Sequence, residues 1–231
     1  YLVHDMGKAN YENAKKYDMI SYLREKKEAG EIKCLGFSCH DSADFIDGVL
    51  NENPFFEFVQ LQINYLDWES EGIQSRKCYE VCVKHDKPVI VMEPVKGGTL
   101  AKLPENVEAM LKEVHPDWSM ARWAISFAAT LPQVKVVLSG MSSEEQLDDN
   151  TSFMKDFTPL SEDENALLLK AAEMIRQSIA IPCTGCRYCM PCPNDVNIPG
   201  MFSVWNSVSL YETDPKDNWD LRQIREKGQG A

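Results

Sequence analysis

Short apolar segments alternate with longer amphipathic segments along the first two thirds of the chain. The short segments have the length and composition of buried β-strands and comprise residues 1–4, 32–37, 57–63, 88–92 and 134–138. The segments between them have helical periodicity, which predicts helices at residues 11–28, 42–50, 76–85, 107–114 and 117–131, and a further helix that Ser142 or Ser143 caps and that runs to about residue 153. Five strands that alternate with helices are typical of a parallel sheet with crossover helices, so the predicted fold class is α/β.

This alternation stops about two thirds of the way along the chain. Ser161 begins an S-x-x-E pattern, which predicts the N-terminus of a long helix. A cysteine-rich loop follows that helix, and further helices are predicted at residues 199–210 and 219–226. We therefore predict an α/β domain at residues 1–158 and a small, mostly helical domain at residues 159–231.

The number of predicted strands bears on whether the sheet is closed. A closed eight-stranded barrel needs about 250 residues, whereas residues 1–158 supply five strands. The α/β domain is therefore either an open sheet or the later part of a barrel. The sequence begins at Tyr1 within what we predict to be a strand, and its last residues contain no helix-capping pattern. We therefore expect a fragment of a longer protein.

Composition disfavours several classes of protein. Of the 231 residues, 44% are hydrophobic, so the chain can bury a core and is not a disordered polypeptide. The formal net charge of −12 disfavours nucleic-acid binding, because phosphate contacts require clustered Lys and Arg. The sequence has no apolar run of about 20 residues and no signal peptide, so we predict no membrane partner and a cytoplasmic location. Eight cysteines in such a chain indicate a reducing compartment rather than disulfides.

Four cysteines lie close together in the segment C-T-G-C-R-Y-C-M-P-C-P, and they are Cys183, Cys186, Cys189 and Cys192. Four thiolates at this spacing, followed by Pro193, are typical of a 4Fe–4S cluster. A structural zinc site usually draws two C-x2-C pairs from separated segments, so zinc is the less favoured alternative. In two-cluster ferredoxins the fourth cysteine of a motif binds the other cluster, so Cys192 belongs either with the other three or with a second cluster.

Polar residues follow every predicted strand. Ligands of α/β sheets bind at the C-terminal ends of the strands, so these residues are candidate site residues. His4 suits a hydrogen bond to a substrate oxygen or a general acid, and Ser38 with Gln60 suits an amide. Gly140 precedes a predicted helix N-terminus, whose N–H groups suit a phosphate. Structural alternatives are a solvated histidine, a solvent-facing glutamine and an ordinary strand-to-helix turn.

Roughly residues 1–155 resemble the second half of an aldo/keto reductase. His4, in L-V-H-D, matches the family's catalytic histidine, and the segment Gly36-Phe-Ser38-Cys39 is similar to the family's G-x-S-N motif. The resemblance implies a (β/α)8 TIM-type barrel, of which this chain supplies about strands four to eight. The implied nicotinamide contacts are Ser38, Cys39, Gln60 and Met92. The segment S-G-M-S-S-E-E-Q-L-D-D-N is implied to bind the cofactor's phosphate and adenine through Ser139, Gly140, Gln146 and Asn150.

The sequence departs from the family pattern at several positions. Cys39 stands where the family usually has Asn, and Met92 stands where it usually has Tyr. Gly140 and Gln146 replace the basic residues that bind the 2′-phosphate of NADP, so NADP selectivity is not supported and NAD and NADP are both candidate cofactors. The resemblance places the family's catalytic Tyr, Lys and Asp on strands before residue 1.

The cysteine region resembles one branch of this family, the reductases with an appended ferredoxin-like domain. Members of that branch usually carry a second cysteine motif downstream, which implies truncation at both ends and one or two clusters in the full-length protein. The resemblance implies an oxidoreductase that acts on a small carbonyl or alcohol, with a nicotinamide cofactor, electrons passed through the cluster, or both. A redox partner protein is a candidate partner. Two alternatives stay open: a catalytically retired barrel that acts as an electron-transfer or interaction module, and a zinc-stabilised binding domain.

Overall fold

The computed structural model describes residues 1–181, 183, 189–211 and 214–229, and it divides into two compact units. The sheet unit comprises Tyr1–Ala101 with Asp117–Leu169, and the helical unit comprises Lys102–Pro116 with Lys170–Ala231. The predicted domain boundary near residue 158 stays a prediction.

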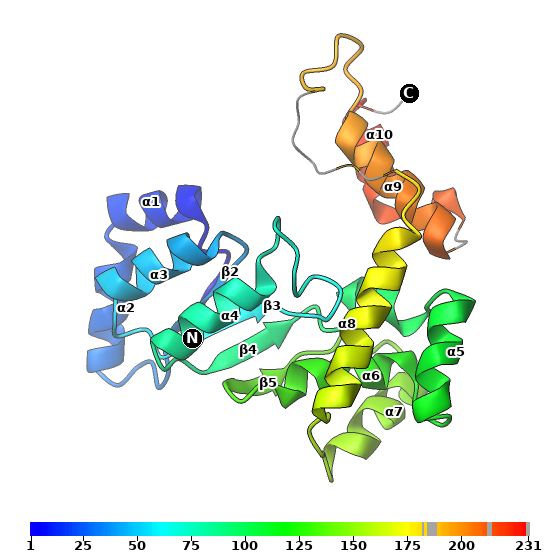
Figure 1. The fold of residues 1–231 in the computed structure, drawn as a ribbon. Coiled ribbons are helices and arrows are strands. Elements are labelled where there is room, and N and C mark those ends of the chain that lie inside the picture. The colour runs from blue at the N-terminus through cyan, green and yellow to red at the C-terminus, as the bar shows by residue number, and fades with distance from the viewer. Residues whose placement is uncertain (182, 184–188, 212–213, 230–231) are drawn as a thin grey trace. The chain divides into compact units, whose positions relative to one another are not determined.

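Five parallel strands form one sheet in the sheet unit, and Figure 1 shows β2 to β5 side by side. The strands are β1 (Leu2–Val3), β2 (Gly36–Cys39), β3 (Phe58–Gln62), β4 (Val89–Met92) and β5 (Val134–Val137). Their spatial order is the same as their order in the chain. A doubly wound sheet reverses its strand order, whereas a (β/α)8 barrel adds each strand next to the last one. The predicted α/β fold with a parallel sheet is confirmed.

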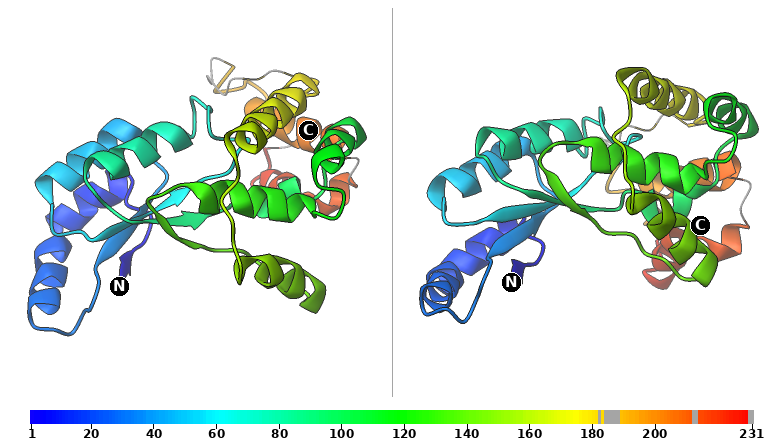
Figure 2. Two further views of the ribbon diagram at one scale, coloured as in Figure 1. Left: turned by 60° about the horizontal axis from the view of Figure 1, so that its bottom comes forward. Right: turned by 90° about the horizontal axis from the view of Figure 1, so that it is seen from below.

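The two faces of the sheet differ in their surroundings. Figure 2 shows helices α3, α4 and α6, in cyan to green, on one side of the sheet. The strand side chains that are fully buried on this helix-covered face are Phe37, Cys39, Val59, Leu61, Val89 and Val91. Successive strand residues point to opposite faces, so Ser38, Gln60 and Met92 lie on the other face. On that second face Gln60 and Met92 are half-buried rather than fully enclosed.

The helices follow the predicted pattern with small shifts of their ends. They are α1 (Lys8–Lys16), α2 (Met19–Glu28), α3 (Ala43–Glu52), α4 (Ser75–Lys84), α5 (Glu105–Val114), α6 (Met120–Thr130), α7 (Glu144–Met154), α8 (Glu162–Gln177), α9 (Ile198–Tyr211) and α10 (Trp219–Glu226). Short 3-10 helices, η1 and η2, comprise Lys96–Ala101 and Pro215–Asp217. The Ser143 hydroxyl accepts a hydrogen bond from the Gln146 N–H, which selects Ser143 as the N-cap of α7. Ser161 and Glu164 form the reciprocal capping box predicted for α8.

Two of the predicted elements near the N-terminus were wrong in their bounds. The single helix expected at residues 11–28 is two helices, because Asp18 adopts a left-handed conformation with φ 54°. The strand expected at residues 32–37 begins only at Gly36. The Leu35 N–H donates to the Glu57 carboxylate at 2.9 Å instead of joining a strand ladder. A side chain from a distant segment therefore delays the start of β2.

Helices α9 and α10 share a small apolar cluster. The buried residues of this cluster are Val204, Leu221 and Ile224, with Met201 and Val208 packed against them from α9. Three buried side chains remove little apolar surface from water, so α9 and α10 gain only modest hydrophobic stabilisation from each other. In the parts of the chain that the structure describes, no helix is both long enough and apolar enough to span a bilayer.

The Glu57 carboxylate is expected to stabilise the fold in a pH-dependent way. Hydrogen bonds from the Lys27 ammonium and the Leu35 N–H lower the pKa of Glu57 below its usual 4.5. A lowered pKa means that this contribution is present at neutral pH and is lost as the pH falls through the folded-state pKa. Because Glu57 is 41% exposed, we expect Glu57→Gln to cost only about 1 kcal/mol at pH 7.

Urea unfolding at pH 7 and at about pH 3 measures this difference. The matched control is Glu31→Gln, which removes the carboxylate of the more exposed Lys26–Glu31 pair. A Glu57→Gln penalty that is equally large at both pH values would contradict the prediction.

Candidate functional site

A cavity of about 330 Å³ lies at the C-terminal ends of β4 and β5. One wall is the loop after β4, from Glu93 to Gly98, and the opposite wall is formed by the segment after β5 and by the exposed side of α7. The volume suits part of a dinucleotide or a small ligand. The cavity brings together four residues predicted from the sequence, namely Ser139, Gly140, Gln146 and Asn150.

Asn150 presents an unsatisfied acceptor at this cavity. Its side chain is 8% exposed, and its Nδ2 donates to the Ser139 hydroxyl at 3.1 Å. Its carbonyl oxygen, Oδ1, is buried without a hydrogen-bond partner. A buried acceptor that has lost its water without gaining a donor destabilises the folded state. A bound ligand with an N–H group would remove this cost.

The loop after β5 is fixed by reciprocal capping contacts. The Gln146 side-chain oxygen accepts from the Ser142 N–H at 2.7 Å, and the Gln146 N–H donates to the Ser143 hydroxyl at 3.3 Å. These contacts hold the predicted phosphate-binding turn at the start of α7. Gly140 has open space where a Cβ would lie, so steric crowding does not explain the glycine there.

The charges that line the cavity are negative. Glu93 and Asp149 are its two charged lining residues, and no Lys, Arg or His is among the described residues that line it. Asp149 accepts a hydrogen bond from the Ser119 hydroxyl at 2.6 Å. Two carboxylates without a balancing cation repel a phosphate monoester. This lining disfavours the 2′-phosphate of NADP. The sequence prediction included Glu93 only as a polar residue that follows a strand, and it missed Asp149, although Asp149 directly precedes the predicted contact Asn150.

Three of the four predicted nicotinamide contacts share one face of the sheet. Ser38 is the register partner of Gln60, and the Gln60 Nε2 lies 3.4 Å from the Met92 sulfur. The Ser38 hydroxyl accepts from the Asp5 N–H at 2.8 Å and keeps its own hydrogen for another acceptor. A hydroxyl on β2, an amide on β3 and a thioether on β4 are therefore neighbours on this face.

The fourth predicted contact, Cys39, lies on the helix-covered face. Its thiol donates to the Met6 carbonyl and accepts from the Asp41 N–H. Burial raises the pKa of Cys39 to about 12, so the thiol stays protonated. The geometry does not bring Cys39 to Ser38, Gln60 and Met92. His4 is exposed directly after β1, and its catalytic role stays a prediction.

The cysteine loop is only partly described. Cys183 and Cys189 are exposed, Cys192 is half-buried, and Cys186 lies outside the described residues. Within residues 1–181, 183, 189–211 and 214–229, no three His, Cys, Asp or Glu side chains converge as metal ligands do. The iron–sulfur site therefore stays a prediction.

One side chain anchors the start of the cysteine loop. Asn206 of α9 accepts from the Ile181 N–H at 2.9 Å and donates to the Ile181 carbonyl at 2.7 Å. On the far side of the loop, the Asn197 N–H donates to the Gln229 carbonyl. The sequence prediction missed Asn206, because a contact across 25 residues leaves no local pattern.

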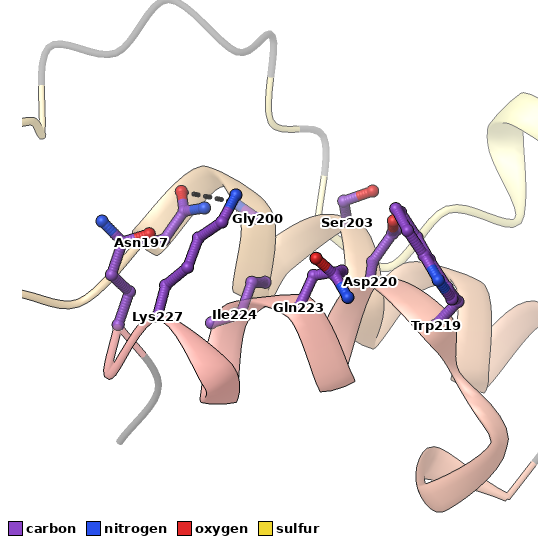
Figure 3. A pocket seen from close by; sticks show the side chains of 9 residues that line it. Asn197, Gly200, Ser203, Trp219, Asp220, Gln223, Ile224 and Lys227 are labelled. Atoms are coloured by element: carbon purple, nitrogen blue, oxygen red, sulfur yellow. Dashed lines mark hydrogen bonds between the residues drawn. The ribbon is translucent and has the colours of Figure 1, made fainter.

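A second hollow, of about 270 Å³, lies between α9 and α10 in the helical unit. Figure 3 shows Gly200 and Ser203 on one side and Asp220, Gln223 and Lys227 on the other. The Gly200 N–H donates to the side-chain oxygen of Asn197, the residue directly before α9, at 3.2 Å. None of its lining residues belongs to the sheet unit, so this hollow is separate from the cavity after β4 and β5.

Comparison with known sequences identifies the family of the sheet unit. The sequence pattern of the aldo/keto reductase family matches residues 1–173, which is most of the chain. No curated protein matches the chain.

Solved structures share the fold at low sequence identity. An aldo-keto reductase from Bacillus halodurans, in its holo form, is 22% identical with a TM-score of 0.58, over 74% of this chain and 59% of that one. An aldo-keto reductase from Klebsiella pneumoniae in complex with NADPH is 17% identical with a TM-score of 0.57, over 74% of this chain and 57% of that one. The present chain therefore spans less than two thirds of these proteins.

Thiol accessibility should differ sharply between the cysteines of the sheet unit. Cys34 is exposed, whereas Cys39, Cys78 and Cys82 are buried and burial raises their pKa values to about 12, 11 and 12. Iodoacetamide at pH 8 reacts with thiolates, so we expect it to alkylate Cys34 and to spare the other three. Mass spectrometry of the native protein measures the pattern. Alkylation of Cys39 as rapid as that of Cys34 would contradict the geometry described here.

Proposed function

Because this chain belongs to the aldo/keto reductase family, we propose that it is part of an oxidoreductase that uses a nicotinamide dinucleotide on a small carbonyl or alcohol substrate. The observation that supports this proposal most strongly is the cavity with the buried, unpartnered Asn150 oxygen. The Klebsiella pneumoniae relative, which is described as an NADPH complex, has the same fold. The bound cofactor would supply or accept a hydride.

We expect the two halves of the proposed cofactor to bind at two different places on this chain. The adenosine part fits the cavity, where Asn150 and Ser139 offer polar side-chain atoms and the start of α7 offers backbone N–H groups. The nicotinamide carboxamide fits Ser38 and Gln60, with Met92 against the ring. In this arrangement His4 would donate a hydrogen bond to the substrate oxygen.

Loss of the Asn150 side chain tests dinucleotide binding directly. Asn150→Ala removes a polar side chain that lines the cavity, so we expect the Kd for NADH to rise about tenfold. Isothermal titration of the full-length protein measures the Kd. The matched control is Asn51→Ala on the exposed surface of α3, which should bind NADH as the wild type does.

A wild-type protein that binds neither NADH nor NADPH would overturn the proposal. That result would instead favour a catalytically retired barrel that serves as an electron-transfer or interaction module. Two departures from the family pattern, Cys39 and Met92, are the sequence features that agree with this alternative.

The negative lining of the cavity leads us to propose NAD as the preferred cofactor. Gln146 is exposed at the cavity, so an arginine there would present a cation to a 2′-phosphate. We expect Gln146→Arg to tighten NADPH binding about tenfold relative to NADH. The matched control is Gln146→Glu, which keeps the oxygen that accepts from Ser142 but adds negative charge, and which should weaken NADPH binding. Tighter NADPH than NADH binding by the wild type would contradict the preference.

We also propose that the cysteine loop binds a 4Fe–4S cluster through Cys183, Cys186 and Cys189, with Cys192 as a fourth ligand to this cluster or to another. The donor set fits such a cluster, because four thiols lie at ferredoxin-like spacing and two of the described ones are exposed. Exposed thiols are unusual, since free cysteine is among the most buried residue types. A bound cluster would supply one-electron transfer to a redox partner and would reinforce the packing of α9 and α10, whose shared apolar cluster is small.

Metal content distinguishes iron–sulfur binding from the zinc alternative. We expect about four iron and four sulfide per cluster in anaerobically purified full-length protein, with absorbance near roughly 400 nm. Cys189→Ser should lower the iron content, whereas Cys34→Ser, an exposed cysteine in the sheet unit, should leave it unchanged. Stoichiometric zinc without sulfide would favour a zinc-stabilised binding domain.

A further inference from the structure

A buried carboxylate lies beside the proposed cofactor site without belonging to it. Asp67, in the segment after β3, is 7% exposed. Its carboxylate accepts hydrogen bonds from the Gln62 and Asn64 amides, each at 3.0 Å. The Lys96 ammonium contacts both carboxylate oxygens, at 2.6 and 2.8 Å. A fully hydrogen-bonded buried carboxylate of this kind fixes the groups around it in one geometry.

The same network contacts the turn after β4 at two positions, Glu93 and Lys96. Lys96 is the third residue after Glu93, and Asn64 donates a second hydrogen bond to the Glu93 carbonyl at 3.2 Å. Asn64 is itself fully buried, and its Oδ1 accepts from the Asp67 N–H at 2.9 Å. Asp67 and Asn64 therefore hold the turn at Glu93 by its backbone and at Lys96 by its side chain.

The turn that they hold has an unfavourable backbone conformation. Glu93 and Lys96 have φ angles of 55° and 49°, in the left-handed region that side chains other than glycine disfavour. Gly97 and Gly98 follow with φ angles of 63° and 93°. Four left-handed residues among six consecutive positions persist only where surrounding contacts determine them. Such conformations are common beside ligand sites.

This turn is the wall of the proposed cofactor cavity. Glu93, Gly97 and Gly98 line the cavity, whereas Asp67, Asn64 and Lys96 are absent from the lining. The Lys96 ammonium is paired with Asp67, and Lys96 is not among the described residues that line the cavity. The network therefore acts on the shape of the cavity rather than on its charge.

We propose that Asp67 is a positioning residue, which holds the turn from Glu93 to Gly98 in the shape that receives the dinucleotide. Asp67 does this through Lys96 and Asn64, and it touches neither cofactor nor substrate. The inference rests on the proposed function, because the ligand whose site is shaped is the dinucleotide. Preorganised walls bind more tightly because the ligand does not have to order them.

Asp67→Asn tests the inference with little change in side-chain volume. In the full-length protein we expect the Kd for NADH to rise about tenfold, because the neutral amide no longer holds Lys96. We expect faster amide hydrogen exchange at residues 93–101 in the ligand-free protein, with exchange in β2 and β3 unchanged. Lys96→Met should have both effects, and Lys96→Arg should retain most of the wild-type affinity.

The matched control is Glu71→Gln, which removes the carboxylate of the exposed Lys77–Glu71 pair in the same unit. It should change neither the Kd nor the exchange rates. If Asp67→Asn does not fold, Lys96→Met decides the question alone. Wild-type Kd or unchanged exchange at residues 93–101 in the folded variants would overturn the inference. A wild-type protein that binds no dinucleotide would remove the proposed function, and the exchange rates would then show separately whether Asp67 orders the turn.

Discussion

Parallel strand pairing in chain order determines where the chemistry of this protein lies. Because β1 to β5 all run in one direction, the residues that follow each strand gather at one edge of the sheet. Residues separated by many positions in the chain, such as Gln60 and Met92, become neighbours there. The cavity after β4 and β5 is a consequence of the same alignment. Strand pairing positions Ser38 and Gln60, whereas side-chain contacts at the start of α7 position the polar groups that follow β5.

Local patterns predicted the sheet and the helix starts well, because both depend on neighbouring residues. Ser42 and Ser143 cap helices as their sequence context predicts. Local patterns failed to predict the end of an element where a contact with a distant residue determines it. The start of β2 depends on the Glu57 carboxylate, which lies 22 residues away from Leu35. The break between α1 and α2 depends on the left-handed Asp18, a conformation that helical periodicity does not reveal.

The candidate site shows the same division between local and distant effects. Ser139, Gly140, Gln146 and Asn150 lie in one segment, so their convergence follows from a single turn and helix. The pairing of Asp67 with Lys96 joins two loops 29 residues apart and has no periodicity to indicate it. Cys39 differs in another way, because strand alternation alone places it on the face opposite to Ser38. The family pattern identifies the position of Cys39, but it does not indicate to which face of the sheet a cysteine at that position points.

If the cavity receives a dinucleotide as proposed, the unpartnered oxygen of Asn150 has a consequence for which base would bind there. An acceptor that is buried and cannot turn to water discriminates between donors and other acceptors. A purine that presents an exocyclic amino group would complete its hydrogen bonding, whereas one that presents a keto oxygen at the same place would set two lone pairs against each other. The selectivity for adenine over hypoxanthine would then arise from a single amide, which the Ser139 hydroxyl holds in orientation.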